Sequence, residues 1–248
     1  MKSPFLLAAC ALAPFMAASQ MVAFAALAVP SFDPAGFELR ETKAFSIAVE
    51  PAASLGEKQN LAQGTAPYRL VPGGIVLSSE ARKPTAYHAR QPRTELSEIR
   101  PWRVQDASAS LDTTIHIDRF PKRGSVILAE LGPDDDNAPV MRILVDGDRI
   151  VLHGQINEAT ANGMTLGTLD STHSAHIVLQ TRPDGLVGTE INGTQSQFHL
   201  APKALAIPVM FRTGAHVVDD IGTTPDQVVV TLTGLSARHG VASSRLRS

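Results

Sequence analysis

The sequence predicts an all-β sandwich, because short segments of alternating apolar and polar residues recur after position 68 and turn residues separate them. In residues 111–118, for example, Leu, Thr, Ile and Ile alternate with Asp, Thr, His and Asp. This is the pattern of a strand that buries one face. Helical periodicity is scarce, which favours a sandwich over alternating β-α-β units.

Turn residues join successive strands of this pattern. Residues 72–74, 146–148 and 183–185 each separate two apolar segments and predict hairpins. Asn192 and Gly193 predict a further tight turn. A closing strand rich in Val and Thr is expected at residues 227–235. No linker or internal repeat interrupts the pattern, so we expect a single domain over residues 29–248.

Residues 1–28 have the composition of a signal peptide. Lys2 is their only charged residue, and the segment ends in the small-x-small pattern of Ala26 and Ala28. Cleavage after Ala28 would leave a periplasmic or secreted protein with no stable membrane insertion. Cys10, the single cysteine of the 248 residues, would be removed with this segment, so we expect no disulfide.

Composition and spacing argue against several classes of function. The formal net charge is only −2, and no basic stripe with interleaved aromatic residues indicates nucleic acid. No phosphate-binding loop or Gly-x-Ser-x-Gly elbow is present. Four histidines lack the spacing of a metal site: His153, His173, His176 and His199. We therefore expect no metal or cofactor. We also expect a monomeric chain.

The first candidate site segment is the expected strand around Arg93. Side chains alternate along an extended chain, so Arg93, Glu95 and Ser97 share one polar face. An arginine in an open cleft can bind a sugar carboxylate through two hydrogen bonds while a neighbouring glutamate orients it. A surface ion pair is the alternative interpretation.

The second candidate segment is residues 209–218. By the same alternation Arg212, Gly214 and His216 point to one side. A basic residue, a gap without a side chain and a titratable imidazole can accommodate a sugar ring beside a proton-transfer group. An exposed strand end with an incidental histidine is the alternative.

These two segments resemble signatures of polysaccharide lyase family 7, the alginate lyases. Arg-Thr-Glu-Leu at residues 93–96 is similar to the arginine-containing signature of that family. Phe-Arg-Thr-Gly at residues 211–214 is similar to its tyrosine-phenylalanine-lysine-alanine-glycine signature, with Arg212 at the lysine. The resemblance covers residues 68–239. It implies a β jelly roll, a concanavalin-like sandwich, whose concave sheet forms a groove for an acidic polysaccharide such as alginate or another polyuronate.

The resemblance also implies a reaction and roles for individual residues. The family cleaves its polymer by β-elimination: the C5 proton of a uronate is removed and the glycosidic bond at C4 breaks. Arg93 would neutralise or position the uronate carboxylate, with Glu95 beside it, and Arg212 would hold the polymer. The family's proton-donating tyrosine falls on His216, which would serve as acid and base because an imidazole exchanges protons near neutral pH.

The chain departs from the family at a third signature, glutamine-isoleucine-histidine. The corresponding residues 127–132 are Ile-Leu-Ala-Glu-Leu-Gly. Strand parity points Glu130 away from its two neighbours, and a one-residue bulge would turn it inward, so it is a candidate substrate contact but not a base. His116, on the polar face of the preceding strand, is a second candidate for the missing imidazole, with a solvent-facing histidine as the alternative. Ser97 stands where the first signature has a second arginine.

Two functions from different classes therefore remain. Either the chain is a polysaccharide lyase in which His216 replaces the tyrosine, or it is a glycan-binding jelly roll that has lost catalysis. The second follows if the missing preorganised donors raise the barrier, since losing one such donor costs about 100-fold to 1000-fold in rate. A glycoside hydrolase would need two facing carboxylates, and Glu95 and Glu98 are expected on opposite strand faces.

Overall fold

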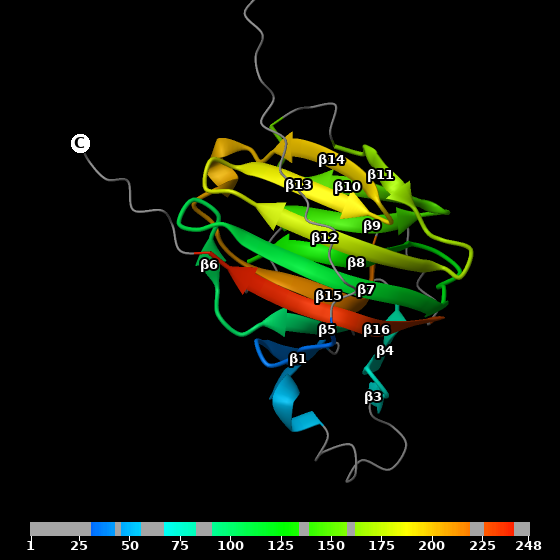
Figure 1. Cartoon of the computed structure of the whole chain (residues 1–248). Coiled ribbons are helices and arrows are strands. Elements are labelled where there is room, and N and C mark those ends of the chain that lie inside the picture. Colours follow the sequence, from blue (N-terminus) through cyan, green and yellow to red (C-terminus); the bar gives the residue numbers. More distant parts are fainter. Residues whose placement is uncertain are drawn as a thin grey trace, which may run out of the picture.

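The computed structural model describes residues 31–42, 46–55, 67–82, 91–133, 139–157, 162–218 and 226–240. These residues form sixteen strands, β1 to β16, and two short 3-10 helices, η1 (Ala52–Ser54) and η2 (Pro202–Ala204). The strands are arranged in two sheets that lie face to face as two layers (Figure 1). The predicted all-β sandwich is confirmed.

The larger sheet has nine strands, and we call it the large sheet. Its order is β11 (Thr165–Thr168), β10 (Arg149–Gly154), β9 (Met141–Asp146), β8 (Ser125–Gly132), β15 (Pro208–Val218), β5 (Arg93–Glu98), β1 (Phe37–Thr42) and β2 (Ile47–Pro51), with β6 (Trp102–Arg103) paired to β15. The central strands come from distant parts of the chain. The large sheet can therefore bring together side chains that no local pattern connects.

The second sheet has seven strands, and we call it the small sheet. Its order is β14 (Thr194–His199), β13 (Leu186–Ile191), β12 (Ser174–Thr181), β7 (Ala109–Arg119), β16 (Asp226–His239), β4 (Gly74–Ala81) and β3 (Tyr68–Val71). Neighbouring strands of this sheet pair in an antiparallel sense. It forms the second layer of the sandwich.

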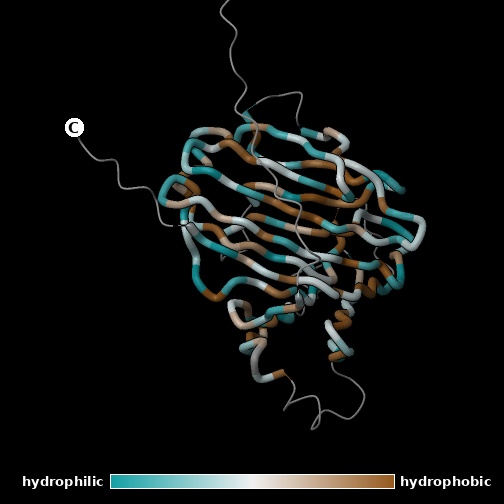
Figure 2. Tube along the Cα trace, viewed as in Figure 1, coloured by the Kyte–Doolittle hydropathy of each residue, from teal (hydrophilic) through white to brown (hydrophobic). Residues whose placement is uncertain are grey.

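The hydrophobic core lies between the two sheets. Apolar side chains alternate with polar ones along the strands, as the interleaved colours of Figure 2 show. On β7, Leu111, Ile115 and Ile117 are at most 1% exposed and belong to the same core cluster as Leu96 of the large sheet. Burial of such side chains contributes roughly 1.5 to 3 kcal/mol each to folding, which fixes the inward face of each strand.

The expected turns are present where the sequence places them. The segment 72–74 closes the β3–β4 hairpin, in which Val71 pairs with Gly74. Asn192 and Gly193 have φ angles of 48° and 83°, the left-handed pair that a tight two-residue hairpin requires. The closing strand β16 is longer than the predicted 227–235, because beyond Leu235 it still pairs with β7.

The predicted signal segment, residues 1–28, lies outside the described residues. Among the residues that are described, no helix has the length and apolar character needed to cross a membrane.

Candidate functional site

The two candidate segments are adjacent strands in the centre of the large sheet. In the antiparallel pairing of β5 with β15, Arg93 lies opposite His216, Glu95 opposite Gly214, and Ser97 opposite Arg212. Residues that lie opposite each other in a sheet project from the same face. Because the intervening residues Leu96, Phe211 and Ala215 belong to the core, this shared face points away from the sandwich interior. The predicted common face of each segment is confirmed, and the two faces are one surface.

Gly214 allows these strands to approach closely. Its φ angle is 153°, and a Cβ atom there would lie 2.5 Å from the carbonyl oxygen of Thr94 and 2.6 Å from the Cα of Glu95. Backbone atoms cannot move aside as a flexible side chain can. Glycine therefore brings the Glu95 carboxylate against β15, between Arg212 and His216.

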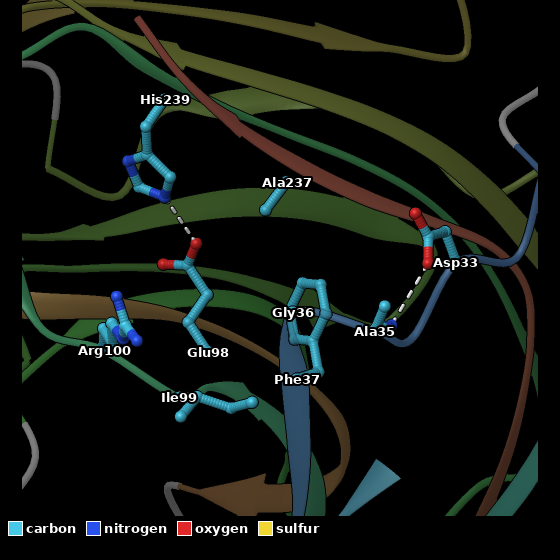
Figure 3. Close-up of a pocket in the computed structure, with 9 residues that line it drawn as sticks. All are labelled: Asp33, Ala35, Gly36, Phe37, Glu98, Ile99, Arg100, Ala237 and His239. Atoms are coloured by element: carbon cyan, nitrogen blue, oxygen red, sulfur yellow. Dashed lines mark hydrogen bonds and ion pairs between the residues drawn. The ribbon is translucent and has the colours of Figure 1, made fainter. Parts of the chain in front are cut away.

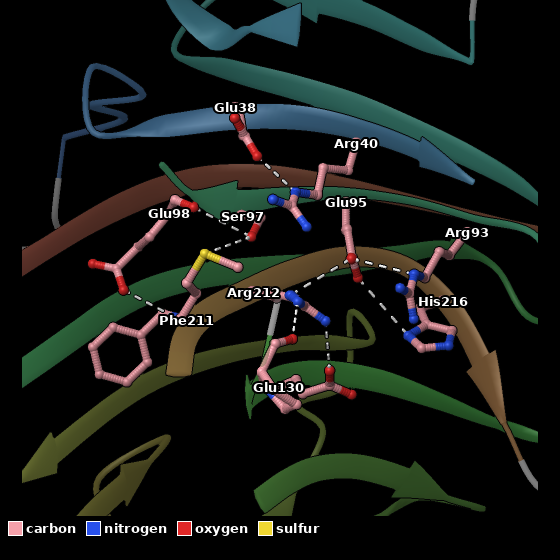
Figure 4. A network of polar contacts seen from close by, with 12 residues as sticks. Glu38, Arg40, Arg93, Glu95, Ser97, Glu98, Glu130, Phe211, Arg212 and His216 are labelled. Atoms are coloured by element: carbon pink, nitrogen blue, oxygen red, sulfur yellow. Dashed lines mark hydrogen bonds and ion pairs between the residues drawn. The ribbon is translucent and has the colours of Figure 1, made fainter. Parts of the chain in front are cut away.

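Arginines and carboxylates alternate across the strands of this face (Figure 4). Glu95 Oε1 lies 3.3 Å from Arg93 Nε and 3.9 Å from Arg212 Nε. Arg212 Nη1 donates to Glu130 Oε1 over 3.3 Å, and Arg142 Nε donates to Glu130 Oε2 over 2.8 Å. A row of fixed guanidinium groups is the arrangement that recognises carboxylates in proteins.

The structure places Glu130 on this face, as strand parity predicts. Its neighbours Ala129 and Leu131 are fully buried in the core, and Glu130 points to the opposite side. A bulge does occur in β8, but it lies earlier, between Ile127 and Ala129. Since Glu130 is held by two guanidinium groups, its role here is to fix Arg212 and Arg142 in position.

Two arginines of this face were missed by the sequence analysis. Arg142 lies opposite Glu130 in the pairing of β8 with β9, and Arg40 lies opposite Glu95 in the pairing of β1 with β5. Arg40 Nε is 2.6 Å from Glu38 Oε1. The signal that points to Arg142 is its position as a cation between buried apolar residues of a hairpin strand. Only the strand order, which is not visible in the sequence, brings it to β8.

His216 carries a neutral imidazole. Its side chain is 4% exposed, and burial lowers its pKa well below the ordinary 6.5. The neighbouring guanidinium groups of Arg93, Arg142 and Arg212 lower the pKa further, in that order. Glu95 Oε2 is 3.9 Å from His216 Nδ1, too far for a hydrogen bond. At neutral pH the imidazole is thus able to accept a proton.

Burial has the opposite effect on Glu95. Removal from water raises the pKa of this carboxyl above 4.5, and the charge of Glu130 raises it further. Arg93, Arg212 and Arg40 act against this rise. The carboxylate of Glu95 therefore takes up a proton at a higher pH than the carboxylate of an exposed glutamate does.

Several buried polar atoms at this site have no hydrogen-bond partner in the protein. They include Glu95 Oε1, Arg212 Nε and His216 Nδ1. Buried polar atoms in folded proteins are nearly always hydrogen-bonded, so a group of unsatisfied ones indicates a place for a polar ligand. Donor, acceptor and imidazole nitrogen together suit a ligand that has both carboxylate and hydroxyl groups.

Comparison with solved structures identifies the fold. The alginate lyase A1-II′, a member of polysaccharide lyase family 7, matches with a TM-score of 0.67 and 17% identity, over 85% of this chain and 97% of its own. An alginate lyase from Pseudomonas aeruginosa matches with a TM-score of 0.62 and 19% identity, over 84% of this chain and 100% of its own. The alginate lyase from Corynebacterium sp. matches with a TM-score of 0.64 and 12% identity, over 83% of this chain and 95% of its own. This chain has the fold of the family 7 alginate lyases.

The predicted jelly roll and the resemblance to family 7 are thereby confirmed at the level of fold. No protein-family model and no curated protein matches the sequence. Two of the solved structures hold sugars: variants of alginate lyase A1-II′ that replace a tyrosine by phenylalanine were determined in complex with product or substrate. The sequence differences at residues 127–132 and at His216 therefore occur in a chain that has the same fold as these enzymes.

His116, the second candidate for the missing imidazole, lies apart from Arg93, Arg212 and His216. His116 lies on β7 of the small sheet and points outward, because Ile115 and Ile117 fill the core. Its Nδ1 is 3.1 Å from Ser174 Oγ and its Nε2 is 3.5 Å from Asp118 Oδ1, on a half-exposed surface. The alternation of residues correctly places His116 on the polar face of its strand. It does not show which of the two sheets the strand joins.

Glu98 faces the sandwich interior, opposite to Glu95, as expected. Its Oε2 accepts hydrogen bonds from Trp102 Nε1 (2.8 Å) and the Phe211 backbone N–H (2.9 Å), and its Oε1 is 2.7 Å from His239 Nε2. A pocket of about 390 Å³ opens beside it (Figure 3). Glu98 therefore links β5, β6, β15 and β16. It does not form with Glu95 the facing pair of carboxylates that a glycoside hydrolase uses.

Among the described residues, no group of three or more histidine, cysteine, aspartate or glutamate side chains is arranged to hold a metal ion.

Proposed function

We propose that this protein is a polysaccharide lyase that cleaves alginate or a related polyuronate by β-elimination. The observation that carries the proposal is the convergence of Arg93, Arg142 and Arg212 on the neutral imidazole of His216, on the face of the large sheet. The family 7 fold supports the same conclusion.

The chemistry needs two kinds of group. Removing the C5 proton of a uronate leaves negative charge that spreads into the carboxylate, so cations placed beside that carboxylate stabilise the transition state. Arg93 and Arg142 suit this role because their side chains retain 12% and 26% exposure. Arg212, which is 2% exposed, holds the internal carboxylates in place.

His216 is the group that moves the proton. The neutral imidazole takes the proton from C5, electrons of that C–H bond form the C4–C5 double bond, and the C4–O bond breaks. The imidazolium ion then gives its proton to the leaving oxygen. Arginines that disfavour the charged imidazole make it a strong acid for this second transfer.

Formation of the unsaturated sugar gives a direct test, since its conjugated carboxylate absorbs ultraviolet light. We expect absorbance to rise when the protein is incubated with alginate, glucuronan or pectin. His216→Gln should lower the rate by about 100-fold to 10,000-fold because a general acid and base is lost. Arg93→Ala should lower it by about 100-fold to 1000-fold. His116→Gln is the matched control, a histidine on the other sheet, and should leave the rate unchanged.

A non-catalytic glycan-binding protein is the second candidate. The burial of His216 and Arg212 and the internal pairing of the arginines favour it. Retained polyuronate binding without any unsaturated product would establish this function and reject the lyase.

Export to the periplasm or the medium, a monomeric state and a single domain over residues 29–248 complete the proposal. Export follows from the composition of residues 1–28.

A further inference from the structure

Glu95 occupies the position between two guanidinium groups that a ligand carboxylate would take. We propose that Glu95 is an internal competitor for Arg93 and Arg212, and that a polyuronate binds at this site together with a proton taken up by Glu95. The inference rests on the proposed function, since it concerns the same site and the same class of ligand.

The geometry of Glu95 is that of a carboxylate loosely held. Its Oε1 is 3.3 Å from Arg93 Nε and 3.9 Å from Arg212 Nε, yet neither contact has the geometry of a hydrogen bond at that oxygen. Arg212 Nε likewise donates no hydrogen bond within the protein. By contrast, Arg142 donates a short hydrogen bond to Glu130. Glu95 is thus the carboxylate that an incoming anion displaces more easily.

Charged groups face Glu95 from every neighbouring strand of the large sheet. Arg40 approaches from β1, Arg93 from β5 itself, and Arg212 and His216 from β15. Beyond β15 lie Glu130 on β8 and Arg142 on β9. A uronate carboxylate bound between Arg93 and Arg212 would therefore lie beside Glu95, which contacts the same two guanidinium groups.

Two ionised carboxylates, that of Glu95 and that of a bound uronate, repel each other strongly in a buried site. Glu95 is 3% exposed at its side chain, so water screens its charge little. A second carboxylate within a few ångströms raises the affinity of one of the pair for a proton. Burial already raises the pKa of Glu95, while Glu130 is held by two guanidinium groups. Glu95 is therefore the acid that takes the proton when a uronate arrives.

Proton uptake makes binding depend on pH. Where Glu95 is ionised in the free protein, each rise of one pH unit should weaken polyuronate binding by up to about tenfold. Glu95→Gln removes this dependence. The amide keeps the shape of the side chain and supplies a donor for the ligand carboxylate, so binding in the variant should be tight at neutral and alkaline pH.

Calorimetric titration with a saturated guluronate trimer measures the proton directly. The apparent binding enthalpy is compared in two buffers of different ionisation enthalpy, in a His216→Gln background that suppresses turnover and removes the titrating imidazole. We expect about one proton to be taken up per trimer. Adding Glu95→Gln should abolish the uptake, whereas adding Glu190→Gln, a carboxyl on the small sheet, should not change it. If the double variant does not fold, the pH dependence of trimer affinity in the His216→Gln protein decides the matter: an affinity that does not fall as pH rises would overturn the inference.

The outcomes separate this inference from the proposed function. Proton uptake that depends on Glu95, without any unsaturated product from polymer, would support the inference and reject the lyase. Unsaturated product together with binding that takes up no proton would overturn the inference alone. Absence of trimer binding at all would overturn it as well.

Discussion

At the scale of single residues, the site depends on opposite effects of burial on an imidazole and a carboxyl. Burial and three arginines keep His216 neutral, while burial favours the protonated form of Glu95. Burial thus favours the uncharged form of both groups. Neither state can be deduced from residue type alone, because both follow from the surroundings.

The lowered pKa of His216 makes folding stability depend on pH. Between its folded-state pKa and 6.5 the unfolded chain binds more protons than the native protein. The free energy of unfolding should therefore rise with pH through this window, by up to about 1.4 kcal/mol per unit, and level off above 6.5. The raised pKa of Glu95 has the opposite effect: from pH 4.5 up to its folded-state pKa, it lowers the free energy of unfolding as pH rises.

Comparison of the parent protein with His216→Gln isolates the imidazole, since the contribution of Glu95 is common to both. The difference between their free energies of unfolding, measured in urea from acid to neutral pH, should increase as pH rises. A constant difference would show that His216 ionises normally in the folded protein.

At the scale of elements, the contact of β5 with β15 sets the geometry of the site. A methyl group at Gly214 would overlap the backbone of β5, which cannot yield. Gly214→Ala should cost about 1 to 3 kcal/mol of stability, the usual range for overpacking. It should also weaken polyuronate binding, because Arg93 on β5 and Arg212 on β15 are pushed apart.

Gly36→Ala is the matched control for this change, since a Cβ at Gly36 meets nothing within 4 Å. Urea unfolding and trimer binding are measured for both variants. Equal behaviour of the two would contradict the importance of the close approach of β5 to β15.

The elements themselves were largely predictable, and their assembly was not. Alternation located β5, β7 and β15 and assigned the inward face of each, because burial of one face imposes a period of two. The order of β9, β8, β15, β5 and β1 depends on long-range pairing, which leaves no local pattern. For this reason Arg142 and Arg40 were missed, and alternation alone did not show that His116 belongs to the small sheet. Arg93 and Arg212 were found, because they lie within recognisable strand segments.

At the scale of the whole molecule, the residues that stabilise the sandwich and the residues of the candidate site lie in different places. The core cluster lies between the sheets, whereas the arginines and His216 lie on the outer face of the large sheet. A change in the centre of β7 therefore affects folding through packing, without touching the residues that bind a uronate.

Ile115→Ala tests this separation. Ile115 is fully buried on β7, in the small sheet, so its truncation leaves a cavity and should lower the free energy of unfolding by about 2 to 5 kcal/mol. At a temperature where the variant is still folded, its affinity for the guluronate trimer should equal that of the parent. A loss of affinity in fully folded Ile115→Ala would mean that core packing is transmitted to the arginines of the large sheet, and that the two layers act as one unit in binding.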